Sequence, residues 1–144
     1  MIKVALIDDH AVFRIGMKYV FRLAKDIVLA AEGECAADAL RIANENLADA
    51  ILLDVRMPGT GGITALEEIR KAKPDQRVLM LTTSDTEEDV FRAVKLGANG
   101  YILKDANPDE LIAAVRTVAA GGKAFPENVR NIYELRAGTK SLSP

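Results

Sequence analysis

The sequence has very little cysteine: Cys35 is the only one among 144 residues, so no disulfide framework can form within the chain. Long apolar runs are also missing, and none approaches the roughly 20 residues that a membrane-spanning helix needs. The start of the chain has only four apolar residues between Lys3 and Asp8, which is too few for a secretory signal peptide. We therefore expect a cytoplasmic protein without contact to a membrane.

An excess of positive charge is the third absence. The chain has 19 Lys and Arg residues against 21 Asp and Glu residues, a net charge of −2, so as a whole it has no electrostatic basis for binding nucleic acid. What the composition does supply is a hydrophobic content of 49% in a chain of single-domain length. That content is enough for a sizeable core.

The most informative stretch runs from residue 50 to residue 58. The apolar residues 50–53 end on the carboxylate of Asp54, and a Met-Pro pair and a glycine-rich loop follow. A run this short between turn signals predicts a buried strand rather than a helix. Asp54 then lies at the carboxyl end of that strand, the edge at which open α/β sheets bind their ligands.

Five such apolar runs alternate with five segments of helical spacing. The predicted strands are residues 4–7, 27–31, 50–54, 78–81 and 101–103. Continuous apolarity is typical of parallel strands that are covered on both faces, and alternation of strands with helices implies right-handed crossovers. We therefore predict an α/β fold, a doubly wound five-stranded parallel sheet with the common strand order 2-1-3-4-5.

Helix signals lie between these runs. The first helix is predicted from four residues at helical spacing, Val12, Gly16, Val20 and Leu23. Asp85 and Glu88 have the spacing of a capping box at the start of the fourth helix, and Asn107 before a proline predicts the start of the fifth.

The character of the chain changes after residue 122. Residues 126–137 predict one short further helix, and residues 138–144 read as a linker or frayed end. We therefore divide the chain into a domain of residues 1–122 and a tail of residues 123–144.

Reactive side chains follow four of the five predicted strands. They are Asp8, Asp9, Asp54, Thr82 and Lys104. In the order 2-1-3-4-5 these four strands are adjacent and ~4.8 Å apart, so the side chains meet at one edge of the sheet. Carboxylates ~5 Å apart repel by roughly 3 kcal/mol per pair at an effective dielectric of ~20, which favours binding of a cation. Oxygen ligands without thiols suit Mg²⁺.

A carboxylate beside a divalent cation is a nucleophile of the aspartyl-phosphate kind, so we interpret Asp54 as a phosphate acceptor. Lys104 and Thr82 would each hold a phosphoryl oxygen, because phosphoryl transfer depends mostly on positioning and charge neutralisation. Plainer interpretations exist for single residues. Asp8 and Asp9 could simply cap the first helix. His10, the only histidine, is interpreted as a structural residue at the start of that helix.

Over residues 1–122 the sequence resembles the receiver domain of two-component response regulators. The motifs that carry the resemblance are Asp8-Asp9, Asp54 with Met57-Pro58-Gly59, Thr82, Gly97-Ala98-x-Gly100-Tyr101 and Lys104. The resemblance implies a flavodoxin-like fold and transfer of phosphate to Asp54 from a phosphohistidine of a sensor histidine kinase. One departure is Asp105, which stands where many receivers have proline; a non-proline cis peptide there would cost ~3 kcal/mol.

The same resemblance implies roles at the metal site. Asp9 would ligate Mg²⁺ directly, Asp8 would assist, and the main-chain carbonyl of Arg56 would be a further ligand. Arg56 and Ser84 occupy the two variable positions that tune the lifetime of the phosphorylated state in this family.

The resemblance also implies a two-state switch. The Thr82 hydroxyl would move to the phosphoryl group and the Tyr101 ring would follow, which changes the surface of the fourth helix, fifth strand and fifth helix. The chain would then be a phosphoacceptor switch that catalyses only its own phosphorylation and dephosphorylation. We expect phosphorylation to change self-association, through that surface or through the first and fifth helices.

The last residues, Leu142-Ser143-Pro144, are similar to the opening of a LuxR-type helix-turn-helix module. The tail would then lead to an output domain, absent from this chain, through which DNA is bound and transcription regulated. Two rival hypotheses remain. An Mg²⁺-dependent phosphatase would usually need a second aspartate where Arg56 stands, and a pseudo-receiver that only binds proteins would not need the complete set of site residues.

Overall fold

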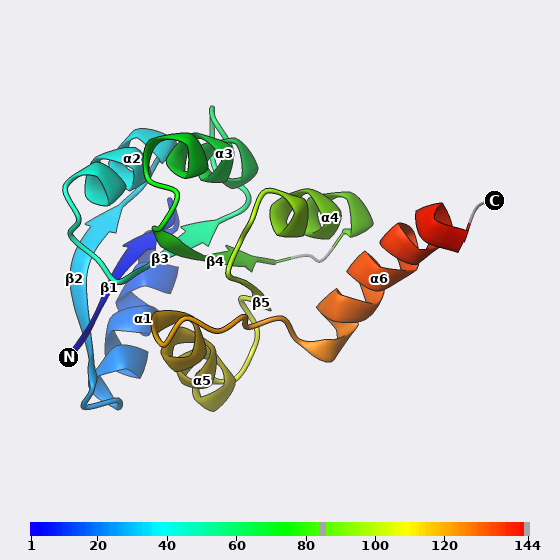
Figure 1. Cartoon of the computed structure of the whole chain (residues 1–144). Helices are drawn as coiled ribbons and strands as arrows, with labels where there is room; N and C mark the ends of the chain where they lie inside the picture. The colour runs from blue at the N-terminus through cyan, green and yellow to red at the C-terminus, as the bar shows by residue number, and fades with distance from the viewer. Residues whose placement is uncertain (84–85, 143–144) are drawn as a thin grey trace.

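The structure is a computed structural model of the chain and describes residues 1–83 and 86–142. Its sheet has five parallel strands in the order β2-β1-β3-β4-β5, which confirms the predicted topology (Figure 1). The strands are β1 (Ile2–Ile7), β2 (Ile27–Gly33), β3 (Ala50–Asp54), β4 (Arg77–Thr82) and β5 (Gly100–Leu103). Ile7 pairs with Leu53, and Asp54 pairs with Leu81, so the carboxyl ends of β1, β3 and β4 lie level.

Helices cover both faces of this sheet. They are α1 (Ala11–Arg22), α2 (Ala36–Asn44), α3 (Gly62–Ala72), α4 (Glu87–Lys95), α5 (Pro108–Ala119) and α6 (Glu127–Leu142). Figure 1 shows α2, α3 and α4 on one face and α1 and α5 on the other, and each face has its own hydrophobic core cluster. All five residues of the central strand β3 are buried, whereas the edge strand β2 alternates between buried and exposed positions.

Capping residues mark two helix starts. Asn107 is the N-cap of α5 and its side chain accepts a hydrogen bond from the main-chain N–H of Glu110 at 2.9 Å, as predicted. At α4 the prediction is wrong by one residue. The N-cap is Thr86, whose hydroxyl accepts from the N–H of Asp89 at 3.3 Å, because the helix begins at Glu87. Asp85 lies outside the described residues.

Helix α1 lies where the sequence predicts it, but its buried face differs. The spacing that predicts it includes Val12 and Leu23, yet these residues are 83% and 75% exposed. The side chains buried against the sheet are Met17 and Phe21. This helix has apolar residues on both sides, so spacing alone does not identify the inner one. The large apolar residues on its exposed side are Val12, Ile15, Tyr19 and Leu23.

The segment after α5 packs onto the domain. Ala124 forms a parallel bridge with Gly100 at the outer edge of β5, and the N–H of Tyr101 donates to the carbonyl of Ala124 at 3.1 Å. Helix α6 then packs against α4, and its Val129 is only 1% exposed within the core (Figure 1). The first part of the tail therefore contributes to the folded unit.

Helix α6 is longer than predicted. It continues to Leu142, so residues 138–142 are helical rather than a frayed end, while the role of the tail as a linker stays a prediction. A single glycine within a helix costs only about 1 kcal/mol relative to alanine, and no proline interrupts the segment before residue 144.

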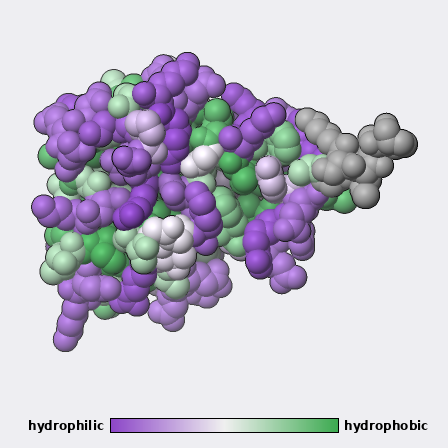
Figure 2. Space-filling view, in the orientation of Figure 1, coloured by the Kyte–Doolittle hydropathy of each residue, from purple (hydrophilic) through white to green (hydrophobic). Residues whose placement is uncertain are grey.

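The surface in Figure 2 is mainly hydrophilic, with hydrophobic residues showing in patches, including near the junction of α4 and α6. Among residues 1–83 and 86–142, no helix combines the length and the apolarity that crossing a membrane would need.

Candidate functional site

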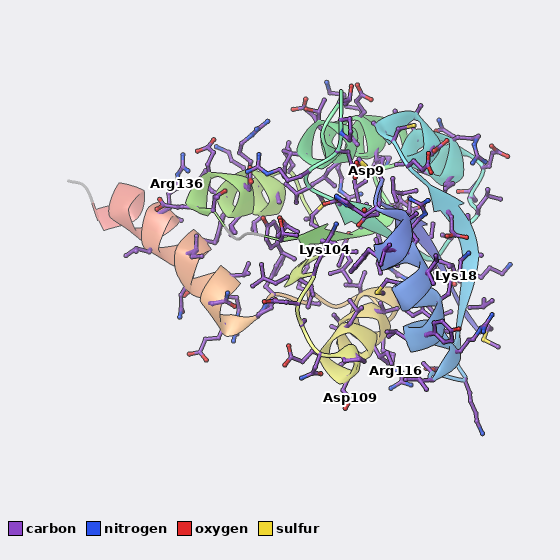
Figure 3. All side chains as sticks on the ribbon, turned by 180° about the vertical axis from the view of Figure 1, so that it is seen from behind. Asp9, Lys18, Lys104, Asp109, Arg116 and Arg136 are labelled. Atoms are coloured by element: carbon purple, nitrogen blue, oxygen red, sulfur yellow. The ribbon has the colours of Figure 1, made fainter. Side chains whose placement is uncertain are left out.

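Three strand ends bring their reactive side chains together. Asp8 follows β1, Asp54 ends β3 and Lys104 follows β5. The Nζ atom of Lys104 lies 2.5 Å from Asp8 Oδ2 and 3.1 Å from Asp54 Oδ2. Both aspartates are buried and the Lys104 side chain is only 9% exposed. Figure 3 shows Asp9 and Lys104 at this same edge of the sheet.

Asp54 is poorly compensated for a buried carboxylate. Burial holds the pKa of its carboxyl above the usual value, against the opposing effect of the hydrogen bonds from Lys104 Nζ and the Arg56 N–H, each 3.1 Å long. The nearby charge of Asp8 raises the pKa of Asp54 further. The site therefore favours any added positive charge.

The donor set fits a hard divalent cation. Four residues, Asp8, Asp9, His10 and Asp54, present ligand atoms that all lie within 4.8 Å of one another. Asp9 Oδ1 is buried and accepts no hydrogen bond from any described residue, whereas the buried Asp8 Oδ2 has Lys104 Nζ beside it at 2.5 Å. Buried oxygens without donors are costly, and Mg²⁺ prefers carboxylate oxygens that leave room for water.

His10 belongs to this cluster as well as to the helix start. It occupies the N-cap of α1, as expected for a structural residue, but its side chain makes no capping hydrogen bond. Its Nδ1 instead lies 2.8 Å from Asp8 Oδ1 and 3.4 Å from Asp9 Oδ1, and the side chain is 61% exposed. Its position directly after the two aspartates was the available sequence signal for a place in the site.

Two residues in the first turns of α1 support the site and were not predicted. Arg14 Nη1 donates to the main-chain carbonyl of Asp8, and its Nη2 donates to Glu34 at 3.0 Å. The ring of Phe13 lies 4.8 Å from Lys104 Nζ, a cation–π distance. Both residues lie on a helix rather than at a strand end, so strand-end reasoning could not find them.

The remaining predicted residues are placed as follows. Thr82 ends β4 and Tyr101 lies in the adjacent β5, and both are fully buried. The main-chain N–H of Arg56 reaches the site, but its guanidinium turns to Asp89 of α4 at 2.5 Å. Ser84 lies outside the described residues, so its tuning role stays a prediction.

Comparison with known proteins identifies the class to which this fold and site belong. The family described as the response regulator receiver domain matches residues 4–116, and the chain belongs to this family. The uncharacterized transcriptional regulatory protein YxjL of Bacillus subtilis (strain 168) is 42% identical over 124 residues, which cover 86% of this chain and 57% of that protein. The nitrate/nitrite response regulator protein NarL of Escherichia coli (strain K12) is 37% identical over the same length and shares.

A solved structure extends the comparison into the tail. The crystal structure of a LuxR-family two-component response regulator from Aurantimonas sp. SI85-9A1 has a TM-score of 0.87 and 28% identity, over 96% of this chain and 99% of that one. The expected resemblance to LuxR-type regulators is thereby confirmed. The chain spans little more than half the length of the curated relatives YxjL and NarL.

Proposed function

We propose that this receiver domain is a switch in which Asp54 accepts a phosphoryl group from a phosphohistidine of a sensor histidine kinase. The observation that carries the proposal is the meeting of buried Asp54 with Asp8 and Lys104, with Lys104 Nζ within 3.1 Å of both carboxylates. Membership of the receiver family supports the same reaction.

In the transfer, an Asp54 oxygen forms a bond to phosphorus while the nitrogen–phosphorus bond of the donor breaks, and its electron pair stays on the imidazole. Asp54 attacks as a carboxylate, so no general base is needed. Lys104 is already in contact with Asp54 and neutralises charge on one phosphoryl oxygen, and Thr82 donates its hydroxyl to another.

The carboxylates of Asp8, Asp9 and Asp54, with the main-chain carbonyl of Arg56, would hold Mg²⁺. When bound, the ion supplies neutralisation of charge on the phosphoryl oxygens. The chain's own contribution is the placement of these oxygens, of which Asp9 Oδ1 is buried and accepts no hydrogen bond from the described residues.

Thr82 and Tyr101 form the switch pair in this proposal. Both are fully buried on adjacent strands, β4 and β5, so a shift of the Thr82 hydroxyl toward Asp54 changes the space open to the Tyr101 ring. The chain is thus a switch that promotes only its own phosphorylation and dephosphorylation, and Arg56 and Ser84 tune the lifetime of the phosphorylated state.

The output of the switch is DNA binding by a LuxR-type domain that follows the tail, in the cytoplasm. Phosphorylation also promotes pairing of two copies of the chain. The surface proposed for this pairing is α1, because its exposed side has the apolar residues Val12, Ile15 and Tyr19. The alternative surface around α4 is already partly covered by α6. Sedimentation with and without a beryllofluoride mimic tests the pairing, and an unchanged mass at every concentration would contradict it.

The direct test of the phosphoacceptor is intact-mass spectrometry after incubation with acetyl phosphate and Mg²⁺. Wild type gains the mass of one phosphoryl group and Asp54→Asn gains none. Asp49→Asn is the matched control, because Asp49 precedes the same strand at its other end and is exposed; this variant gains the phosphoryl group as wild type does.

Two results would count against the proposal. Equal mass gain in wild type and Asp54→Asn would move the phosphoacceptor elsewhere, and no gain in any variant would favour a pseudo-receiver. Sustained turnover of a phosphate monoester would instead favour the phosphatase hypothesis.

A further inference from the structure

One ion pair connects the loop after Asp54 to helix α4. The main-chain N–H of Arg56 donates to Asp54, and the Arg56 guanidinium lies 2.5 Å from the Asp89 carboxylate in the first turn of α4. The two partners differ in burial, because the Arg56 side chain is 62% exposed and that of Asp89 only 11%. The arginine can therefore rotate away without unpacking, whereas the aspartate cannot reach water without movement of α4.

The neighbours of Asp89 on α4 hold helix α6. The rings of Phe91 and Tyr133 stack with centroids 5.5 Å apart, and the Arg136 guanidinium lies 4.4 Å over the Phe91 ring. Arg136 Nη1 also lies 2.7 Å from Glu88 Oε2. Figure 3 shows Arg136 where α6 meets α4. The first two turns of α4 thus lie between the candidate phosphorylation site and the tail helix.

A phosphoryl group on Asp54 would compete with Asp89 for the arginine. It adds a charge of about −1.5 to −2 and three strong acceptor oxygens, whereas Asp89 offers a single carboxylate. A planar guanidinium binds phosphate oxygens in pairs. Arg56 also lines an open cleft together with Asp9 and His10, and its side chain is 62% exposed, so solvent does not hinder its rotation.

We propose that Arg56 and Asp89 form a latch between the phosphorylation site and α6. While the pair is closed, the Asp89 charge is compensated and α4 stays where α6 packs against it. When a phosphoryl group draws Arg56 away, Asp89 is left as a buried carboxylate without its cation, which is strongly unfavourable. The first turn of α4 then moves to bring Asp89 to water, and Glu88 and Phe91 release α6.

The latch rests on the proposed phosphorylation of Asp54, but one arm of its test does not. Hydrogen–deuterium exchange of the amides of residues 127–137, read by mass spectrometry, reports the release of α6. In wild type, acetyl phosphate with Mg²⁺ speeds this exchange about 5-fold or more. Arg56→Gln, which leaves Asp89 unpaired, gives the same increase without any phosphate.

Two further variants separate a latch from a general loss of structure. Arg56→Gln combined with Asp89→Asn removes the buried charge as well, so α6 regains wild-type protection. Asp89→Asn alone still gains the phosphoryl group on Asp54, but its α6 stays protected. Asp26→Asn is the matched control: it breaks an ion pair of 2.8 Å with Arg116 of α5, on the other face of the sheet, and leaves α6 exchange unchanged.

The outcomes distinguish the latch from the proposed function. Wild-type exchange in Arg56→Gln, or release of α6 in phosphorylated Asp89→Asn, overturns the latch while the phosphoacceptor role stands. Absence of any mass gain in wild type overturns the phosphoacceptor role, and the Arg56→Gln result then still decides whether the ion pair controls α6. Circular dichroism of each variant confirms that the fold is retained.

Discussion

The amino and carboxyl edges of the sheet, where the strands begin and end, differ in how their buried charges are compensated. At the amino edge, Arg70 of α3 donates to the carbonyls of Gly97 and Gln76 at 2.5–3.1 Å and to the side chain of Asn99 at 2.7 Å. At the carboxyl edge, three aspartates lie together, Lys104 pairs with only two of them, Asp8 and Asp54, and the buried Asp9 Oδ1 accepts no hydrogen bond from the described residues.

The same physical effect, burial, acts on both edges. It lowers the pKa of the Arg70 guanidinium and raises that of the Asp54 carboxyl, since each shift disfavours the charged form. Hydrogen bonds to fixed neutral acceptors offset the cost of removing the Arg70 guanidinium from water. These bonds also join α3 to the residues just before β4 and β5. The aspartates are left in need of a cation, so they reduce stability and favour binding.

The largest expected effect on stability is at the amino edge of the sheet, where Arg70 has all its hydrogen-bond acceptors. Arg70→Met leaves the Gly97 and Gln76 carbonyls without their donor, and should lower the free energy of unfolding by about 3 kcal/mol. For a chain of this size that corresponds to a fall in Tm of roughly 6–12 °C. Urea denaturation followed by circular dichroism measures it.

Arg41→Met is the matched control. Arg41 of α2 forms an exposed pair with Glu45, 3.6 Å away and four residues on at the C-cap of the helix, and such pairs contribute only about 0.5 kcal/mol. Equal losses in the two variants would show that the buried position of Arg70 has no special importance.

At the carboxyl edge, removal of a charged side chain is expected to stabilise the fold rather than destabilise it. Without divalent cations, Asp54→Asn should raise the free energy of unfolding at pH 7 by about 1–2 kcal/mol, because it removes like-charge repulsion from a buried cluster. The folded pKa of Asp54 is raised, so its ionised form costs stability at neutral pH, and the cost falls away as the pH drops through that pKa.

Mg²⁺ sharpens this comparison. It should stabilise wild type by binding only the folded state, and stabilise Asp54→Asn less, so the difference between them shrinks as the ion is added. Asp49→Asn serves as the control and should respond to Mg²⁺ as wild type does. A destabilised Asp54→Asn in chelator would contradict the idea of a crowded acidic site.

Much of this contrast was predictable at the carboxyl edge. Apolar runs predict strands because parallel strands bury both faces, and the strand order then determines which strand ends meet. The sequence therefore predicts that Asp8, Asp54 and Lys104 lie together. The contacts of Arg70 could not be predicted, because nothing in its local sequence indicates that its acceptors lie six to 29 residues further on.

The errors have the same origin. The buried face of α1 is decided by contacts with the sheet, and because apolar residues lie on two sides of the helix, the spacing that includes Val12 does not identify Met17 as buried. The packing of α6 depends on the Phe91–Tyr133 contact, between residues far apart in the sequence. The Arg56–Asp89 pair is of the same kind, so the link from the site to α4 became visible only in the fold.

The Glu88–Arg136 ion pair between α4 and α6 has one largely exposed partner, unlike the buried charges at the two edges of the sheet. Its loss is therefore expected to have the smallest effect on stability. The side-chain hydrogen bond from Arg136 is the main cause that holds the pKa of Glu88 below its ordinary 4.5, and nearby Arg92 acts in the same direction. A lowered folded pKa means that the contribution to stability is present above pH 4.5 and is lost as the pH falls through the folded pKa. Two-dimensional NMR of the amides of residues 127–137 should therefore show α6 loosening in acid below that value. Arg136→Gln lacks the pair at every pH, so its α6 signals should not change across this window; if they follow the wild-type titration, another group controls the acid response of α6.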